Sequence, residues 1–284
     1  MCRMRCLMAV VVLMWGCDED FEARTLLEGY RVMGISADRP EVGLEDTVTL
    51  HVHDFDTEGR PPTYRWSVCM ASVGAENNFE CVDETWRFSL EGARTLTVDF
   101  ERVGAESVSL SSIYEQALSR YGGMPSATGI KDLEEGFDVL FTLNSGPEGG
   151  REVETVKRVT VRSPAREEGP NTNPEVSRFS VEAVARASTS VELAVEVTDG
   201  SAQPYVLERY GEDGVVVESS DATEELAYTW YTTAGETDPP VTFGDVQRTT
   251  LKLPAEAGLV RVFVTVRDGR GGLDVAEAEI EVRP

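Results

Sequence analysis

The chain has only two imidazoles, His51 and His53, which stand two residues apart in the segment HVHD. Imidazoles are common zinc ligands and common general bases, so this pair is the first candidate for chemistry. Val48, Leu50 and Val52 alternate with polar residues, which is typical of a half-buried strand. If these apolar residues face inward, both imidazoles face solvent. We therefore interpret the pair as an exposed strand face and not as a metal site.

Other catalytic signatures are absent from the sequence. No phosphate-binding glycine loop, HExxH motif or GxSxG motif occurs. A hydrolytic triad needs a histidine, and only His51 or His53 could supply it. An enzyme would have to rely on carboxylates such as Asp83 and Glu84, and nothing in their spacing distinguishes them. We predict that the protein is not an enzyme.

Three aspartates in expected loops are the candidates for a bound cation. Asp199, Asp268 and Asp274 lie on loops or loop edges, where carboxylate oxygens suit calcium. However, no D-x-D-x-D run is present, and Asp-Gly is by itself a favourable hairpin turn. We predict no cofactor and no metal, with calcium at these three residues as the alternative.

The N-terminus predicts export. Arg3 and Arg5 precede an unbroken apolar run from Leu7 to Trp15, and the small residue Gly16 follows. The run is too short for a transmembrane helix, which needs about 20 residues. It matches the apolar core of a signal peptide, about 7–15 residues. We assign residues 1–16 to a signal peptide.

The Gly16-Cys17 pair resembles the lipobox of Gram-negative bacterial lipoproteins. In that family the cysteine is lipidated, the chain is cut before it, and the new amino end is acylated. Met14 stands where Leu is usual, and Trp15 is bulkier than the family prefers, so an ordinary signal peptide cut elsewhere is the alternative. The resemblance implies lipidation at Cys17 and a place in the cell envelope, at the outer membrane. Asp18 resembles an inner-membrane retention signal of some enteric bacteria, which leaves the membrane and its face open.

The remaining cysteines predict a disulfide. Cleavage removes Cys2 and Cys6, and lipid would occupy Cys17, so Cys69 and Cys81 remain. Thiols of a secreted chain are expected to pair. A bridge between these two would stabilise the fold by about 3 kcal/mol. A metal-binding pair is the alternative, and no further Cys or His lies nearby to complete a zinc site.

The charge of the chain restricts its partners. It carries 26 basic and 51 acidic residues, a net charge of −25, and loss of the two arginines of the signal peptide makes the mature chain −27. Such a chain repels phosphate backbones, so we predict no nucleic-acid partner. Anionic lipid headgroups would repel it as well, so it should stand off the membrane on its lipid.

The mature length of 268 residues suggests two domains. The segment SPAREEGPNTNPE, residues 163–175, is rich in Pro and charge and reads as a linker with few contacts across it. We predict the following division: a lipid-anchored tether at 17–26, a first domain at 27–163, a linker at 164–175 and a second domain at 176–284.

Both halves contain many short alternating strands separated by turn residues, and they echo each other. TYRWSV (63–68) matches AYTWYT (227–232), and each follows an alternating strand. The Y-x-W strands, together with the V-x-V-x-D-G-x-G-G hairpin of the second half, resemble bacterial Ig-like and PKD-type modules. This resemblance implies an all-β chain of two Ig-like β-sandwich domains in tandem. Trp66 and Trp230 would lie between the sheets.

Each half carries an insertion. We predict one short helix inserted in the first domain, at about Ile113 to Arg120, before a Gly-Gly stop. In the second half, YVLERY and VVVES would form a hairpin. Loops at the ends of a sandwich commonly carry function, and the loop from Cys69 to Trp86 is a further candidate.

These observations lead to a non-enzymatic envelope lipoprotein that acts as a binding or scaffolding subunit for a membrane or surface protein partner. The alternative is an adhesin or glycan-binding surface lipoprotein. Exposed aromatic residues on loops would favour that alternative, and the candidates are Tyr205, Tyr210, Tyr231 and Phe243.

Overall fold

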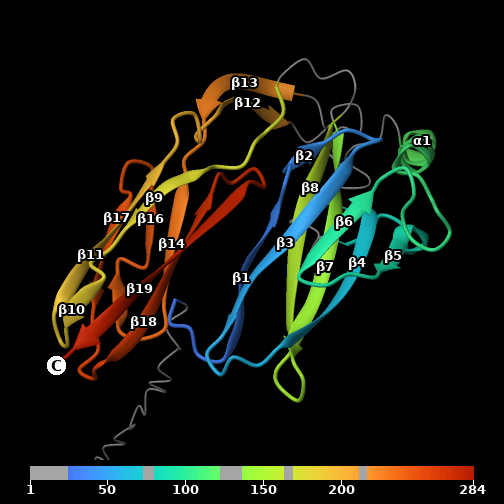
Figure 1. The fold of residues 1–284 in the computed structure, drawn as a ribbon. Coiled ribbons are helices and arrows are strands. Elements are labelled where there is room, and N and C mark those ends of the chain that lie inside the picture. The colour runs from blue at the N-terminus through green and yellow to red at the C-terminus, as the bar shows by residue number, and fades with distance from the viewer. Residues whose placement is uncertain (1–24, 73–79, 122–135, 163–168, 211–215) are drawn as a thin grey trace, which may run out of the picture.

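The computed structural model describes residues 25–72, 80–121, 136–162, 169–210 and 216–284 (Figure 1). The signal peptide, Cys17 and the tether as far as residue 24 lie outside these ranges. The described chain forms two β-sandwiches that lie side by side. Its α-helical content is a single short helix, and that helix is neither long nor apolar enough to cross a membrane.

The first sandwich packs a three-stranded sheet against a five-stranded sheet. In spatial order, the first sheet is β1 (Tyr30–Ala37), β3 (Thr47–Asp56) and β6 (Thr95–Asp99). The second is β2 (Glu41–Val42), β8 (Val153–Arg162), β7 (Gly136–Pro147), β4 (Pro62–Ser72) and β5 (Arg87–Leu90). The β2–β8 pair is parallel, and the other neighbours are antiparallel.

The second sandwich repeats this arrangement. One sheet is β15 (Glu236–Asp238), β17 (Arg248–Lys252), β11 (Ser190–Val197) and β9 (Val176–Ser180). The other is β10 (Val184–Arg186), β19 (Leu273–Arg283), β18 (Gly258–Arg267), β14 (Ala227–Thr232) and β16 (Val241–Phe243). The β10–β19 pair is again parallel. Both halves are therefore Ig-like sandwiches, and the predicted all-β tandem fold is confirmed.

The first strand of each half changes sheets partway along. In the second half, β9 pairs with β11, and β10, which follows it, pairs with β19 in the facing sheet. The first half divides in the same way into β1 and β2. A strand that crosses over closes one edge of each sheet, which periodicity within the segment cannot reveal.

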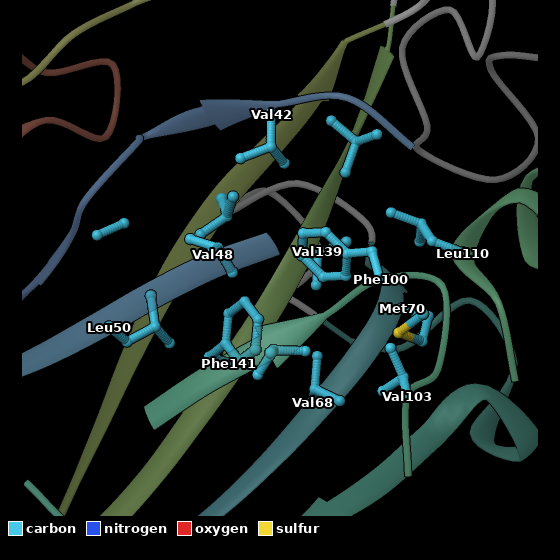
Figure 2. Close-up of a cluster of buried hydrophobic side chains, with 14 of the residues drawn as sticks. Val42, Val48, Leu50, Val68, Met70, Phe100, Val103, Leu110, Val139 and Phe141 are labelled. Carbon is cyan, nitrogen blue, oxygen red and sulfur yellow. The ribbon is translucent and has the colours of Figure 1, made fainter. Parts of the chain in front are cut away.

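A tryptophan lies at the centre of each core, as predicted. The exposed fraction of Trp66 is 3% and that of Trp230 is 0%. Each indole N–H is satisfied: Trp66 Nε1 donates to the Ala93 carbonyl at 2.9 Å, and Trp230 Nε1 donates to Thr242 Oγ1 at 3.1 Å. Figure 2 shows part of the first core, where Phe100 and Phe141 lie among aliphatic side chains from both sheets.

Both predicted insertions are present. Helix α1 spans Leu110–Tyr121, slightly longer than expected, and Ser109 caps its start by accepting the N–H of Ser112 at 3.2 Å. In the second half, β12 (Pro204–Tyr210) pairs with β13 (Val216–Thr223) in an antiparallel hairpin. The two strands form a separate two-stranded sheet, outside either sandwich.

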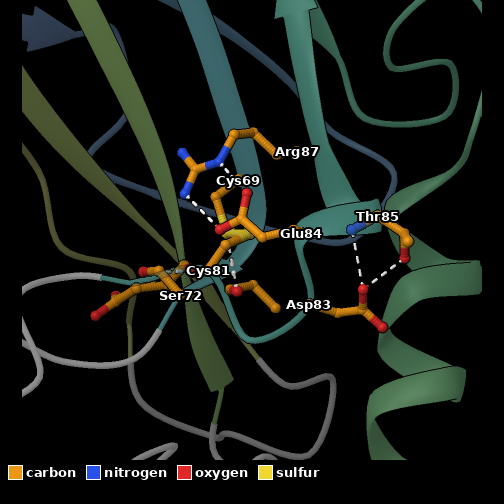
Figure 3. Close-up of a disulfide and its surroundings, with 9 residues drawn as sticks. Cys69, Ser72, Cys81, Asp83, Glu84, Thr85 and Arg87 are labelled. Atoms are coloured by element: carbon orange, nitrogen blue, oxygen red, sulfur yellow. Dashed lines mark hydrogen bonds and ion pairs between the residues drawn. A yellow bond between two sulfur atoms is a disulfide. The ribbon is translucent and has the colours of Figure 1, made fainter.

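The predicted disulfide between Cys69 and Cys81 is also present (Figure 3). Cys69 lies on β4 and pairs with Leu140 of β7. The disulfide, together with a bridge between Ser72 and Cys81, holds Cys81 beside the end of β4, shortly before the 3-10 helix η2 (Glu84–Trp86) begins. It closes a short loop within the first sandwich.

Candidate functional site

The two carboxylates considered for catalysis are occupied by neighbouring donors (Figure 3). Asp83 Oδ1 accepts the backbone N–H and the hydroxyl of Thr85, and Asp83 Oδ2 accepts Arg120 Nη1 at 2.7 Å. Glu84 forms a bidentate pair with Arg87 at 2.8 and 3.1 Å. These hydrogen bonds lower the pKa of both carboxyl groups. Both are therefore ionised acceptors at neutral pH, with no free proton for acid catalysis.

The two histidines differ from one another, contrary to the expectation that both face solvent. His51 is exposed, and its Nδ1 lies 3.0 Å from Thr95 Oγ1. His53 is half-buried, and its Nε2 lies 2.8 Å from Ser36 Oγ. Burial, followed by the charge of His51, lowers the pKa of His53 to about 4, so this ring is neutral at neutral pH. Neither described cavity is lined by His53 or Ser36.

Two of the three aspartates considered for calcium, Asp268 and Asp274, hold backbone groups in place. Buried Asp268 accepts the N–H groups of Arg270 and Gly272 at Oδ1, at 2.7 and 2.8 Å. Asp274 Oδ2 accepts the N–H of Val176 at 2.7 Å, and Asp199 is exposed at a turn. Across the described ranges, no three acidic, histidine or cysteine side chains gather where they could hold a metal. The structure does not bring these three residues together.

Asp268 instead belongs to the contact between the two sandwiches, which we call the joint. Its apolar part is a cluster of Leu27, Met33, Tyr231 and Phe263, with Phe55 packed against it. The Phe55 and Phe263 ring centroids are 5.3 Å apart, and the Arg261 guanidinium lies over the Phe55 ring at 5.7 Å. The cluster joins β1 and β3 of the first sandwich to the outer face of β14 and β18.

The polar part of the joint uses two asparagines of the expected linker. Asn171 is buried, and its Nδ2 donates to Asp268 Oδ2 at 2.8 Å while its backbone N–H donates to Glu41. Asn173 Nδ2 donates to the Ala37 carbonyl at 2.7 Å, and its Oδ1 accepts the N–H of Leu273 at 3.1 Å. Asn173 therefore bridges the two sandwiches through its side chain alone, and Asn171 does so through its backbone N–H and its side-chain amide together.

Two further donors cross the joint without the linker. Arg267 Nη2 donates to the Met33 carbonyl at 2.6 Å, and Lys157 Nζ donates to the Gly271 carbonyl. Burial lowers the pKa of Lys157 to about 8. The linker residues supply amide groups that bond to both sandwiches, which the sequence composition did not reveal.

The start of the described chain also belongs to the joint. Leu26 pairs in parallel with Thr232 at the end of β14, and Thr232 donates its N–H to the Thr25 carbonyl at 3.0 Å. Leu27 is 1% exposed. Residues 25 and 26, which we had assigned to the tether, therefore lie against the second sandwich, and the chain enters the folded body beside the end of β14.

The described surface has a groove of about 650 Å³ beneath the hairpin β12–β13. Its walls come from three parts of the chain: the segment that joins the sandwiches, the hairpin, and the turn between β18 and β19. The lining residues that matter for recognition are Pro170, Gln203, Tyr205, Asp221, Thr223 and Arg270. The groove thus combines one aromatic ring, one carboxylate and several hydrogen-bonding groups.

Arg270 connects these walls. Its guanidinium lies 5.0 Å from the Tyr205 ring centroid, and its Nη1 donates to Glu224 Oε1 at 3.0 Å. Glu224 is buried, which raises the pKa of its carboxyl group, and its Oε2 accepts the N–H of Gln203 at 2.9 Å. The Gln203 side chain in turn accepts the N–H of Thr172 at 2.9 Å. These bonds hold the groove open in a fixed shape.

The groove and the start of the described chain lie at opposite ends of the second sandwich (Figure 1). Leu26 pairs with Thr232, the last residue of β14, whereas the hairpin returns to the sandwich at Glu224, just before β14 begins at Ala227. A tether that leads away from Thr25 would therefore place the groove at the far end of the body.

The aromatic residues proposed for ligand contact are scattered. Tyr205 lines the groove, whereas Tyr231 is 9% exposed, belongs to the joint and lines a separate cavity of about 500 Å³. Phe243 is 52% exposed on the edge strand β16, away from the groove. The side chain of Tyr210 lies outside the described residues. Sequence reasoning missed Arg270 and Glu224, although the charged residue inside the D-G-R-G-G turn was a visible signal.

Comparisons with known proteins give structural similarities only. No family model matches the chain, and no curated protein matches it. Among solved structures, the D0–D1 domain of intimin is 12% identical, with 88% of this chain and 98% of that chain covered and a TM-score of 0.24.

Two other solved structures are similar in the same limited way. The N-terminal Ig1-2 module of the Drosophila receptor protein tyrosine phosphatase DLAR is 10% identical, with 90% and 100% of the two chains covered and a TM-score of 0.27. Three N-terminal domains of the Hoc capsid protein of bacteriophage RB49 are 15% identical, with 89% and 59% covered and a TM-score of 0.23. Such low scores say nothing about what this chain binds.

Proposed function

We propose that the protein is a non-enzymatic, lipid-anchored binding subunit of the bacterial envelope, and that it holds a protein partner in the groove beneath β12–β13. The observation that carries this proposal is the position of the groove, which lies at the end of the second sandwich opposite the point where the chain enters. A ligand site at that end faces away from the membrane to which a lipid on Cys17 would attach the chain.

The joint supports the same proposal. An apolar cluster and several buried hydrogen bonds connect the sandwiches, so the groove is attached to one firm body. We infer two domains, at 27–163 and 176–284, with 164–175 between them and an anchor at the outer membrane. A body of this kind presents a site at a set distance from its anchor, which is the requirement of a scaffolding subunit.

In-cell crosslinking tests the proposal. A photo-crosslinking amino acid would replace Ala222, which lines the groove, or Glu256, which is exposed in the β17–β18 connection of the second sandwich. We expect Ala222 to give one dominant protein adduct in the host and Glu256 to give none. Adducts of equal yield at both positions, or no adduct at Ala222, would contradict a protein-binding groove.

A glycan ligand is the second candidate, because Tyr205 offers an aromatic ring beside Asp221, Gln203 and Thr223. Retention of the mature protein on cell-wall or polysaccharide beads, lost in Tyr205→Ala, would favour this candidate over a protein partner. Anchoring is tested separately: Cys17→Ser should release the protein from the membrane fraction, and unchanged palmitate-analogue labelling would refute lipidation at Cys17.

A further inference from the structure

In the hairpin β12–β13, both faces of strand β13 are exposed. Every residue from Val217 to Asp221 is exposed, although neighbouring residues of a strand point to opposite faces. Val217 is 58% exposed, and Leu207 on β12 is 52% exposed. A lone two-stranded ribbon is marginally stable in water, and a third strand stabilises it. This segment therefore has the properties of a sheet that lacks a strand.

The outer edge of β13 has free backbone groups in a regular series. The Glu224 N–H donates to the Gln203 carbonyl at 3.0 Å, which makes these two residues a hydrogen-bonded pair. In an antiparallel ladder such pairs alternate with non-bonded pairs. From the register, Ser219, Asp221 and Thr223 direct their N–H and C=O groups away from β12. Within the described ranges, no backbone group of these three residues has another hydrogen-bond partner.

The opposite edge of the hairpin is less suitable for pairing. By the same alternation, the outward residues of β12 are Pro204, Val206 and Glu208, and proline has no N–H to donate. Edges that are neither short nor interrupted by proline are the ones that accept another strand. The β13 edge has neither protection along Ser219 to Thr223.

We propose that the edge of β13 captures an extended, basic segment of the protein partner as a third strand of the hairpin. This proposal rests on the proposed function and specifies how the partner is held. Charge selects the occupant: Asp221 is exposed on this edge and lines the groove, and no ion pair to it occurs in the described chain. A lysine or arginine directly opposite Asp221 would be favourable. The mature chain, at −27, attracts basic segments in general.

A second copy of this chain is a poorer occupant. Antiparallel pairing of β13 with itself about Asp221 would place the Asp221 side chains of the two copies opposite one another, and like charges opposite one another destabilise a ladder. Two bodies of large negative charge also repel each other before contact.

The test uses the mature, detergent-solubilised protein and a short synthetic peptide in which lysine alternates with threonine or valine. Hydrogen exchange of the amides in 216–223 is measured with and without the peptide. We expect exchange in this segment to slow by about tenfold or more at saturation, because outward amides gain acceptors. A control peptide has the same sequence and charge but carries N-methyl groups on alternate backbone amides, so one of its edges has no N–H donors. This control should bind at least about tenfold more weakly.

Variants of the protein separate pairing from charge. Ser219→Pro removes an outward N–H that β12 does not use, so the hairpin persists while peptide binding falls by about tenfold. Ser219→Ala is the matched control and should bind as the parent does. Asp221→Lys leaves the backbone intact and should weaken the lysine peptide while it strengthens one with glutamate in place of lysine.

Several outcomes overturn the proposal. Equal binding of the N-methylated peptide, or no slowing in 216–223 at millimolar peptide, excludes strand addition. A dimer of the free protein that Ser219→Pro abolishes would make a second copy the occupant instead. If Ala222 still crosslinks one partner while Ser219→Pro leaves that adduct unchanged, the groove stands and only strand addition fails.

Discussion

The joint and the hairpin β12–β13 differ in how their polar groups are satisfied. In the joint, buried Asn171 and Asp268 bond to each other, the Asn171 N–H donates to the Glu41 carboxylate, and Asp268 accepts the N–H of Gly272. In the hairpin, strand residues are exposed on both faces and one edge has no partner in the described chain. The joint is therefore closed mainly by contacts within the chain, whereas the hairpin has an open edge along β13.

The largest effect should follow from damage to the core that supports both regions. Trp230→Ala removes a fully buried indole and should lower the free energy of unfolding by about 3–5 kcal/mol. Phe243→Ala, at an exposed aromatic of the same sandwich, should change it by less than about 0.5 kcal/mol. Urea denaturation followed by circular dichroism measures both. Equal losses in the two variants would contradict the placement of Trp230.

The apolar part of the joint is tested by Phe263→Ala. Phe263 is 4% exposed and contacts Phe55 across the joint, so its loss should lower the free energy of unfolding by about 3 kcal/mol. We also expect the parent to melt in one transition and the variant in two, because the sandwiches then unfold separately. Scanning calorimetry reports this directly. Two transitions already present in the parent would show that the joint does not couple the halves.

The polar part of the joint should contribute somewhat less. Asn171→Ala leaves the buried Asp268 Oδ2 without its amide donor and should cost about 1–3 kcal/mol. Thr172→Ala, at the exposed neighbour, keeps its backbone bond to Gln203 and serves as the control. Proteolysis within 169–175 should speed up in the first variant only. A stable, protease-resistant Asn171→Ala would mean that this segment is held by other contacts.

A pH effect distinguishes the half-buried His53 from its exposed neighbour. Its folded pKa is about 4 against about 6.5 when unfolded, so the unfolded chain binds more protons between these values. Stability should therefore fall as the pH drops from 6.5 to 4, by about 1–2 kcal/mol for a ring that is only half-buried. Because carboxylates titrate in the lower part of this range, the measurement is the difference between the parent and His53→Gln at each pH. If His51→Gln changed the pH dependence of stability by as much as His53→Gln does, the proposed difference between the two histidines would be contradicted.

The smallest effect is expected in the hairpin. Leu207→Thr replaces a side chain that is 52% exposed and should change the free energy of unfolding by less than about 0.5 kcal/mol. The change should be visible instead as weaker partner crosslinking at Ala222. A large loss of stability would show that the hairpin packs against the body, and the comparison with the joint would then fail.

Much of the fold followed from local pattern. The alternation of Val48, Leu50 and Val52 correctly predicted β3, and the repeated Y-x-W segment correctly predicted β4 and β14. The disulfide followed from counting cysteines. These predictions succeed because strand periodicity and thiol pairing depend on residues that are close in sequence or few in number.

The candidate site was predicted only in part. The hairpin and Tyr205 were identified, but Arg270, which completes the groove, lies 65 positions further along the sequence, in a turn that was interpreted through its glycines. The prolines and charges of the linker predict a spacer, whereas Asn171 and Asn173 bond to groups of both sandwiches. Amino-acid composition indicates whether a segment forms regular structure, but it does not show which groups the side-chain amides will contact in the fold.

By itself the sequence determined the class of fold, the repeat, the disulfide, the hairpin and a strong negative charge, and it supports export through its N-terminus. The tertiary structure decided which faces are covered. It buried Tyr231 and half-buried His53, satisfied Asp268, brought Gly169, Tyr205 and Arg270 around one groove, and left one edge of β13 open. The physical reason is that the alternation of residues along a strand shows which of its faces packs inward from its own sheet. Contacts between sheets and between sandwiches depend instead on surfaces from distant parts of the chain.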